Sequence, residues 1–152
     1  MPTWVAIVAD DLNDYSAGAK VSALRSKALA EGQTDPFARV MPDVAATARG
    51  YLARGGQNQL SLTANSVPPE AKTHLCWLII EALQARLPGL ALKDEEKRMI
   101  DRAWQYLRDV AKGDIAIATP DDPTTPDVQA GSAITVVNAP ERRFTRHRLE
   151  GI

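Results

Sequence analysis

Hydrophobic residues are densest between positions 67 and 87, and their spacing predicts a buried helix. One stripe at helical spacing is formed by Ala71, Leu75, Leu78, Ile79, Ala82 and Leu83. Cys76, Trp77 and Ile80 widen that stripe until little polar surface remains over the middle turns. A helix that is apolar on nearly all sides is buried against several neighbours, so we expect the central helix of a small bundle. Its charged residues make it too polar to cross a bilayer.

Amphipathic helices are predicted on both sides of this central helix. Thr34-Asp35-Pro36 begins one with a capping residue and a proline, and its apolar face continues to Leu52 as a single helix kinked at Pro42. The other begins near Lys93 and ends at Gly113, with a face of mixed charge that we expect to be solvated or to contact a neighbouring subunit. Together with the central helix it supplies the expected core: Leu75, Leu78, Ile79, Leu83, Ile100, Trp104 and Leu107.

The first 33 residues predict smaller elements. The β-branched run after Trp4 favours a short strand, and Asp10 or Asp11 then caps a turn that starts at Leu12. A further helix is expected from Ser16, with one apolar stripe and a C-terminal glycine cap at Gly32. That stripe consists of Val21, Leu24, Ala28 and Leu29.

The composition changes at Asp114. A short strand is expected over residues 115–118, a proline-rich acidic linker over residues 119–126, and a basic end over residues 140–152. We therefore divide the chain into a helical body, residues 1–113, and a C-terminal arm, residues 114–152. The fold class is all-α: a small bundle of four or five helices with a long, largely extended arm that leaves room for short β-strands. An arm of this kind needs another surface to become ordered.

The net charge and the cysteine content argue against some classes of function and some cellular compartments. The net charge is −1, which gives no overall basic field for recruiting nucleic acid. The single cysteine excludes an internal disulfide and suits a reducing compartment. The short apolar run after Trp4 meets Asp10-Asp11 and has no preceding Lys or Arg, so we read no signal peptide and expect an intracellular, soluble protein.

No residue pattern predicts catalysis. His74 and Cys76 lie two apart on a helix and face different directions, so they cannot form a nucleophile–base pair, and Cys76 is expected in the core. His147 lies in the arm. Asp10, Asp11 and Asp14 are candidate cation ligands, although capping of the following turn explains them better. We predict no enzymatic activity, no metal and no cofactor.

The basic end has two interpretations. Arg142, Arg143, Arg146 and Arg148 surround Phe144, and such a cluster is typical of a tail that binds nucleic-acid phosphates. Phe144 with Leu149 and Ile152 instead suits a peptide that docks on a protein, because arginines then pair with carboxylates around apolar pockets. We favour docking. The docking residues would be Arg142, Arg143, Phe144, Arg146, Leu149 and Ile152.

Several motifs occur in a characteristic order. They are Asp10-Asp11-Leu12, Gly50-Tyr51-Leu52, Val67-Pro68-Pro69, the helix residues Trp104, Leu107, Val110, Ala111 and Gly113 with Ile115 after them, and the ending Arg143-Phe144-Thr145-Arg146 with Leu149-Glu150-Gly151-Ile152. This order resembles the Mu-like phage head–tail connector (adaptor) family, whose members carry a similar ending. The chain departs from the family pattern around Asn13–Gln33 and after Tyr51-Leu52, where Gly55-Gly56 and a polar loop follow.

The resemblance implies structural work in a virion. Such connectors form a ring, usually of about twelve copies, on the portal vertex of the head. They extend the DNA channel, let DNA pass without sequence-specific binding, and present a surface to the next neck or tail-completion protein. The expected partners are thus further copies of the chain, the portal and that protein, with no membrane. The protein would be made in the bacterial host cytoplasm and reside in the neck. The alternative is a small helical DNA-binding regulator that uses its basic arm.

Overall fold

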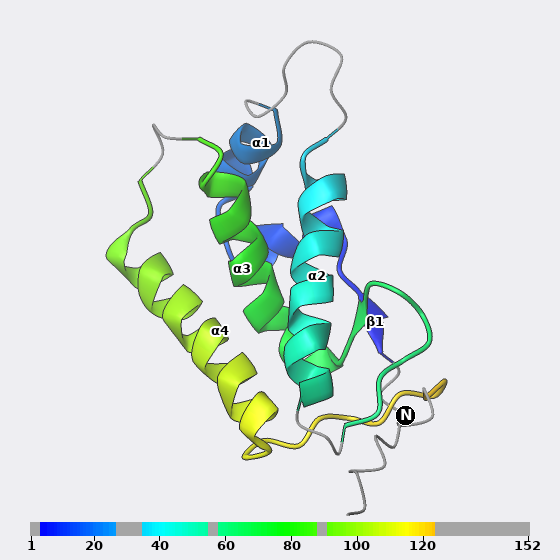
Figure 1. The fold of residues 1–152 in the computed structure, drawn as a ribbon. Helices are drawn as coiled ribbons and strands as arrows, with labels where there is room; N and C mark the ends of the chain where they lie inside the picture. The colour runs from blue at the N-terminus through cyan, green and yellow to red at the C-terminus, as the bar shows by residue number, and fades with distance from the viewer. Residues whose placement is uncertain (1–3, 27–34, 55–57, 88–90, 124–152) are drawn as a thin grey trace, which may run out of the picture.

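The computed structural model describes residues 4–26, 35–54, 58–87 and 91–123 (Figure 1). These ranges are mostly helical. Four α-helices are formed: α1 (Gly18–Ser26), α2 (Phe37–Arg54), α3 (Lys72–Gln84) and α4 (Asp94–Lys112). Two 3-10 helices, η1 (Ala9–Asp14) and η2 (Pro69–Ala71), and two short strands, β1 (Val5–Ala6) and β2 (Ser66–Val67), complete the described elements. The mostly helical character predicted from the sequence is confirmed.

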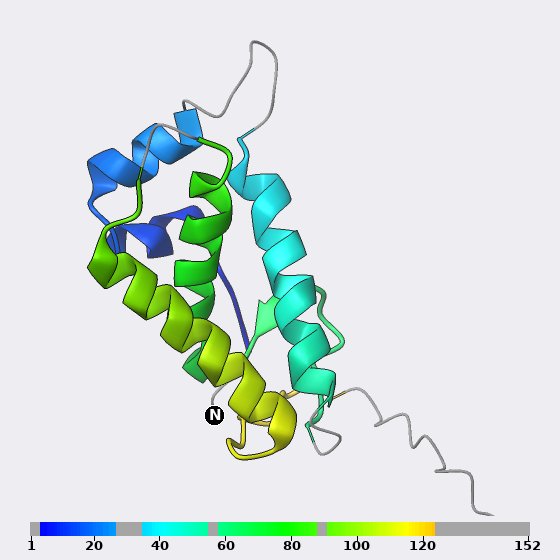
Figure 2. The ribbon, with the colours of Figure 1, turned by 60° about the vertical axis from the view of Figure 1, so that its left-hand side comes forward.

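The central helix α3 lies between α2 and α4 and packs against both, while α2 also contacts α4 (Figure 1). Figure 2 shows that α2 and α4 approach each other at their C-terminal ends and diverge toward their N-terminal ends, with α3 behind the opening. Of the expected core residues, Trp104 is half-buried and the others are buried: Leu75, Leu78, Ile79, Leu83, Ile100 and Leu107. Apolar faces of three helices therefore form one core.

The central helix is shorter than the range 67–87 predicted for it. Val67 is in β2 and pairs with Val5 of the antiparallel strand β1, and Pro68 is extended, with φ −62° and ψ 142°. Pro69 begins η2, where its missing N–H is not needed, and the α-helix follows from Lys72. The two paired residues are 62 positions apart in the sequence. The spacing of apolar residues within one helix carries no information about such a distant partner.

The ends of the flanking helices follow the sequence signals. The Asp35 carboxylate accepts a hydrogen bond from the Phe37 N–H at 2.9 Å, and α2 runs as one helix through Pro42. Glu96 reaches back to accept from the Lys93 N–H at 2.9 Å at the start of α4. Gly113 ends α4 at φ 88°, a left-handed conformation that glycine adopts without a Cβ clash.

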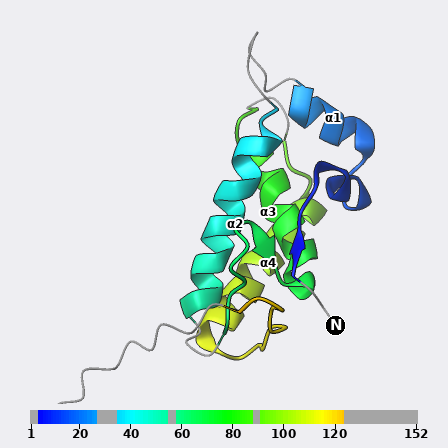
Figure 3. The same ribbon diagram turned by 90° about the vertical axis from the view of Figure 1, so that its right-hand side faces the viewer.

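The N-terminal segment is partly as predicted. The short strand after Trp4 is β1. The turn expected to start at Leu12 is a 3-10 helix, η1, that already starts at Ala9. The next helix, α1, begins at Gly18 rather than Ser16 and buries Val21 and Leu24. The rest of its predicted stripe, Ala28 and Leu29, lies outside the described residues, as does the predicted Gly32 cap. In Figure 3, β1, η1 and α1 form a layer on one side of α3.

The strand predicted over residues 115–118 is not formed, and that prediction is wrong. Residues 114–123 instead return along the body. The Trp4 Nε1 donates a hydrogen bond to the Ala118 carbonyl at 2.8 Å, and Ile115 and Ile117 pack against the cluster of Trp4, Leu52 and Val110. An apolar surface already present on the body thus binds the two isoleucines, and no strand among the described residues pairs with them.

Candidate interaction surfaces

Three ion pairs fasten the N-terminal layer to the three-helix core. Lys20 of α1 contacts both carboxylate oxygens of Glu96 in α4, at 2.5 and 2.6 Å. Lys72, at the start of α3, lies 2.7 Å from Asp11 of η1. Arg25 of α1 binds Asp35, just before α2. Each of the three core helices is therefore tied at its N-terminal part to the same layer.

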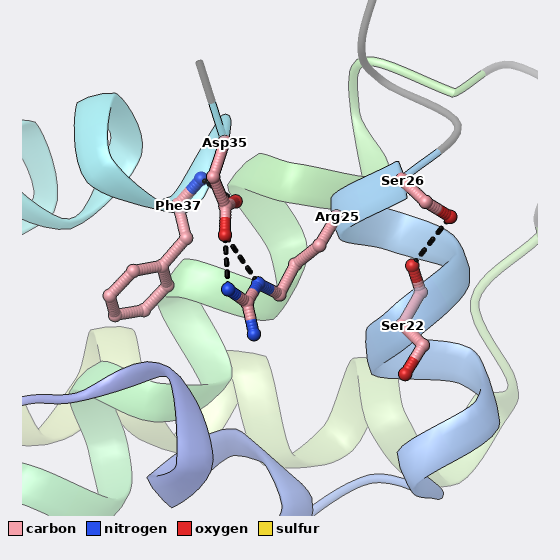
Figure 4. Close-up of polar contacts among 5 residues, drawn as sticks. All are labelled: Ser22, Arg25, Ser26, Asp35 and Phe37. Atoms are coloured by element: carbon pink, nitrogen blue, oxygen red, sulfur yellow. Dashed lines mark hydrogen bonds and ion pairs between the residues drawn. The ribbon is translucent and has the colours of Figure 1, made fainter.

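Asp35 serves two purposes at one position (Figure 4). Its Oδ1 caps α2 through the Phe37 N–H, and its Oδ2 accepts from the Arg25 Nε at 2.6 Å and from the same guanidinium's second nitrogen. Burial raises the pKa of Asp35, but the hydrogen bonds from Arg25 and from the Phe37 N–H, together with the Arg25 charge, outweigh burial and hold this pKa below its ordinary value. The capping role was predicted from the sequence and the ion pair was not.

Asp11 likewise caps and pairs. Its Oδ2 accepts from the Val8 N–H at 2.8 Å, and its Oδ1 faces Lys72. Burial alone raises the pKa of Asp11, and the hydrogen bonds from Lys72 and Val8 reverse this and lower it. Asp11 therefore does cap, but from the third position of η1 and through the N–H of Val8, and not from ahead of a turn that starts at Leu12 as predicted. Within the described ranges, Asp10, Asp11 and Asp14 belong to no group of side chains that could hold a metal ion.

His74 and Cys76 occupy different surroundings. The His74 ring stacks on Tyr106, with 4.2 Å between the ring centroids, and burial lowers the pKa of His74. Cys76 is fully buried, as predicted, and burial followed by the charge of Asp11 raises its thiol pKa to about 12. A thiol with that pKa is protonated at neutral pH and is a poor nucleophile. His147 lies outside the described residues.

A groove opens where α2 and α4 diverge over α3. It has a volume of about 370 Å³, and its lining residues are Asp43, Val44, Thr47, Leu78, Glu81, Ala82, Ala85 and Trp104. The floor is apolar, and the lining residues that carry charge are two carboxylates. We call this feature the α2–α4 groove. Sequence periodicity had placed Val44 and Trp104 on core-facing stripes, yet both are only half-buried because the helices splay apart at this level.

A second hollow, of about 550 Å³, lies between α1 and α4. Lys20, Glu96 and Arg98 are among its lining residues, and Lys20 and Glu96 neutralise each other. Cations and carboxylates are therefore mixed along its walls. A ligand of one charge would meet both attraction and repulsion there, so the α2–α4 groove is the better-defined recognition surface.

Residues 114–123 form a third feature, the point from which the remaining chain leaves the body. The Leu62 N–H donates to the Asp122 carbonyl at 3.0 Å, and the Thr63 hydroxyl donates to the Asp122 side chain at 3.0 Å. Ser61 and Pro123 form an isolated antiparallel bridge. Trp4 and Asp122, which hold this segment, were not singled out by the sequence. The signal in the sequence that could have indicated this contact is Trp4 itself, a large apolar residue outside the predicted helices.

The predicted docking residues lie outside the described residues: Arg142, Arg143, Phe144, Arg146, Leu149 and Ile152. No helix in the described ranges is long and apolar enough to cross a membrane. No protein-family model, curated protein or solved structure matches the chain significantly.

Proposed function

We propose that the chain is a structural bacteriophage head–tail connector that forms a ring on the portal vertex and extends the DNA channel toward the tail. The proposal starts from the family resemblance, above all from the ending Arg143-Phe144-Thr145-Arg146 with Leu149-Glu150-Gly151-Ile152. A connector must hold two larger assemblies together. It therefore needs a rigid body and a means of reaching a partner, which we assign to the helical core and to a largely extended C-terminal arm.

The observation that carries this proposal is the fixed exit of the chain at Pro123. Trp4, Leu62 and Asp122 hold residues 114–123 against the body through the hydrogen bonds described above. The described part of the arm is therefore held at a defined place on a folded body, and the proposed docking residues follow it in the sequence. A tethered segment with a fixed origin searches a limited volume, which raises its effective concentration at a partner surface.

A ring of identical copies needs two different surfaces on each copy, because every contact joins one patch to another around a closed circle. The body offers the α2–α4 groove as one of these surfaces. The charged outer face of α4, where Asp101, Arg102 and Arg108 are exposed, remains available to a further partner. Near-neutral net charge also suits a channel wall, because a strongly basic wall would hold the DNA that has to pass.

Binding of the complete chain to portal protein tests the proposal. Cosedimentation of the two should show addition of the chain at one fixed stoichiometry. Phe144→Ala should remove most of this binding, because the chain adds to the portal as a ring and the tip of its basic end joins the copies. The control Arg148→Ala should remove much less, because a buried aromatic contributes more than a rim charge. The alternative, a DNA-binding regulator, predicts a different result. The chain would then not bind the portal but would bind duplex DNA, with an affinity that falls steeply between about 50 and 200 mM salt.

A further inference from the structure

We propose that the α2–α4 groove is the docking site for the C-terminal tip, residues 141–152, of a neighbouring copy. Phe144 would occupy the apolar floor, and the arginines around it would face Asp43 and Glu81 at the rim. The inference rests on the proposed ring and assigns its two complementary patches, the groove of one copy and the tip of the next.

The groove is suited to an aromatic side chain because Trp104, the largest side chain that lines it, is already held in place. Trp104 donates from Nε1 to the Glu81 Oε2 at 3.1 Å. The indole also packs against Tyr51 in a T-shaped arrangement, with 6.2 Å between the ring centroids. Leu78 closes the bottom and is 3% exposed. A wall that is fixed before binding loses little entropy when the ligand enters, which favours affinity.

Charge complementarity selects the occupant. The charged residues that line the groove are Asp43 and Glu81, both acidic. The tip has four arginines within five positions of Phe144, namely Arg142, Arg143, Arg146 and Arg148. A cationic segment with a central aromatic fits an apolar groove with an acidic rim, and arginine can pair with a carboxylate through two parallel hydrogen bonds.

The length of chain after Pro123 permits this contact. About 20 residues separate Pro123 from Phe144, enough to span up to ~66–72 Å when extended, whereas α2 is only ~27 Å long. This reach covers the groove of the same body as well as that of a neighbour. Because the proposed ring requires contacts between copies, we assign the tip to the groove of the next copy.

A disulfide cross-link in the complete chain tests the pairing. Thr47 is exposed at the groove and Thr145 follows Phe144, so Thr47→Cys with Thr145→Cys places one thiol on each patch. The buried Cys76 should not compete. Mild oxidation of the portal-bound protein should give covalent multimers on a non-reducing gel. The control pair, Ala53→Cys with Thr145→Cys, uses an exposed position of α2 outside the groove and should remain mostly as single chains.

The cross-linking result distinguishes the groove assignment from the connector function. Multimers at least tenfold above the control pair support the groove assignment. A disulfide closed within one chain, or cross-linking equal to that of the control, overturns it. Rings on the portal without the cross-link would overturn the groove assignment alone and leave the connector function standing. Absence of rings with unsubstituted protein would overturn the connector function itself.

Discussion

Substitution of Trp4 by alanine should release the segment from which the arm leaves the body. Trp4 is 6% exposed, packs with Leu52 and Val110, and holds the Ala118 carbonyl at 2.8 Å. Truncation of a buried tryptophan to alanine costs about 3–5 kcal/mol. The hydrogen bond accounts for only ~0.5–1.5 kcal/mol of this. Trp4→Phe, which keeps most of the packing, should therefore lose far less stability than Trp4→Ala.

Hydrogen exchange at the Leu62 amide measures the release directly, because that N–H bonds to the Asp122 carbonyl. A local loss of ~3 kcal/mol corresponds to an increase of more than 100-fold in exchange rate. Leu83→Ala is the control, since Leu83 is fully buried in the main core and its truncation costs a comparable ~2–5 kcal/mol. If Leu62 exchanges no faster in Trp4→Ala than in Leu83→Ala, Trp4 does not hold the segment.

Three further results are expected. Leu107→Ala should lower the free energy of unfolding, measured in urea, by about 2–5 kcal/mol. The control Leu62→Ala, at a side chain that is 70% exposed, should change it by less than ~0.5 kcal/mol. Equal effects would contradict the core assignment. Cys76 should react with a thiol reagent only as fast as the protein unfolds, and rapid native labelling would place it at the surface. Burial raises the pKa of Glu96, but the hydrogen bonds from Lys20 and from the Lys93 N–H, together with the charges of both lysines, hold this pKa below its ordinary value of 4.5. The stabilisation from Glu96 is therefore complete above pH 4.5 and is lost as the pH falls through the lower folded value. Glu96→Gln should flatten the acid limb of the stability curve, and an unchanged limb would refute the pair.

Helical periodicity predicted the core because burial of one face imposes a local repeat on the sequence. Leu75, Ile79 and Leu83 recur at that repeat and are buried together. The caps at Asp35 and Gly113 were predictable for a related reason, since each satisfies a local backbone requirement. These features depend on neighbours within about four positions, which a single sequence displays.

Features that depend on distant neighbours were missed. The strand pairing of Val5 with Val67 shortened the central helix, and the ion pair of Lys20 with Glu96 joins positions 76 apart. The groove arises because α2 and α4 splay apart, so Trp104 keeps an exposed edge although its position lies on an apolar stripe. Crossing angles are set by the whole set of packed side chains, and no short pattern encodes them.

Electron microscopy of the purified complete chain, with and without portal protein, tests the connector function most directly. We expect rings of one copy number, seated as an added collar on the portal and coaxial with its channel. A chain that stays monomeric alone and leaves the portal unchanged when mixed with it would contradict the connector function.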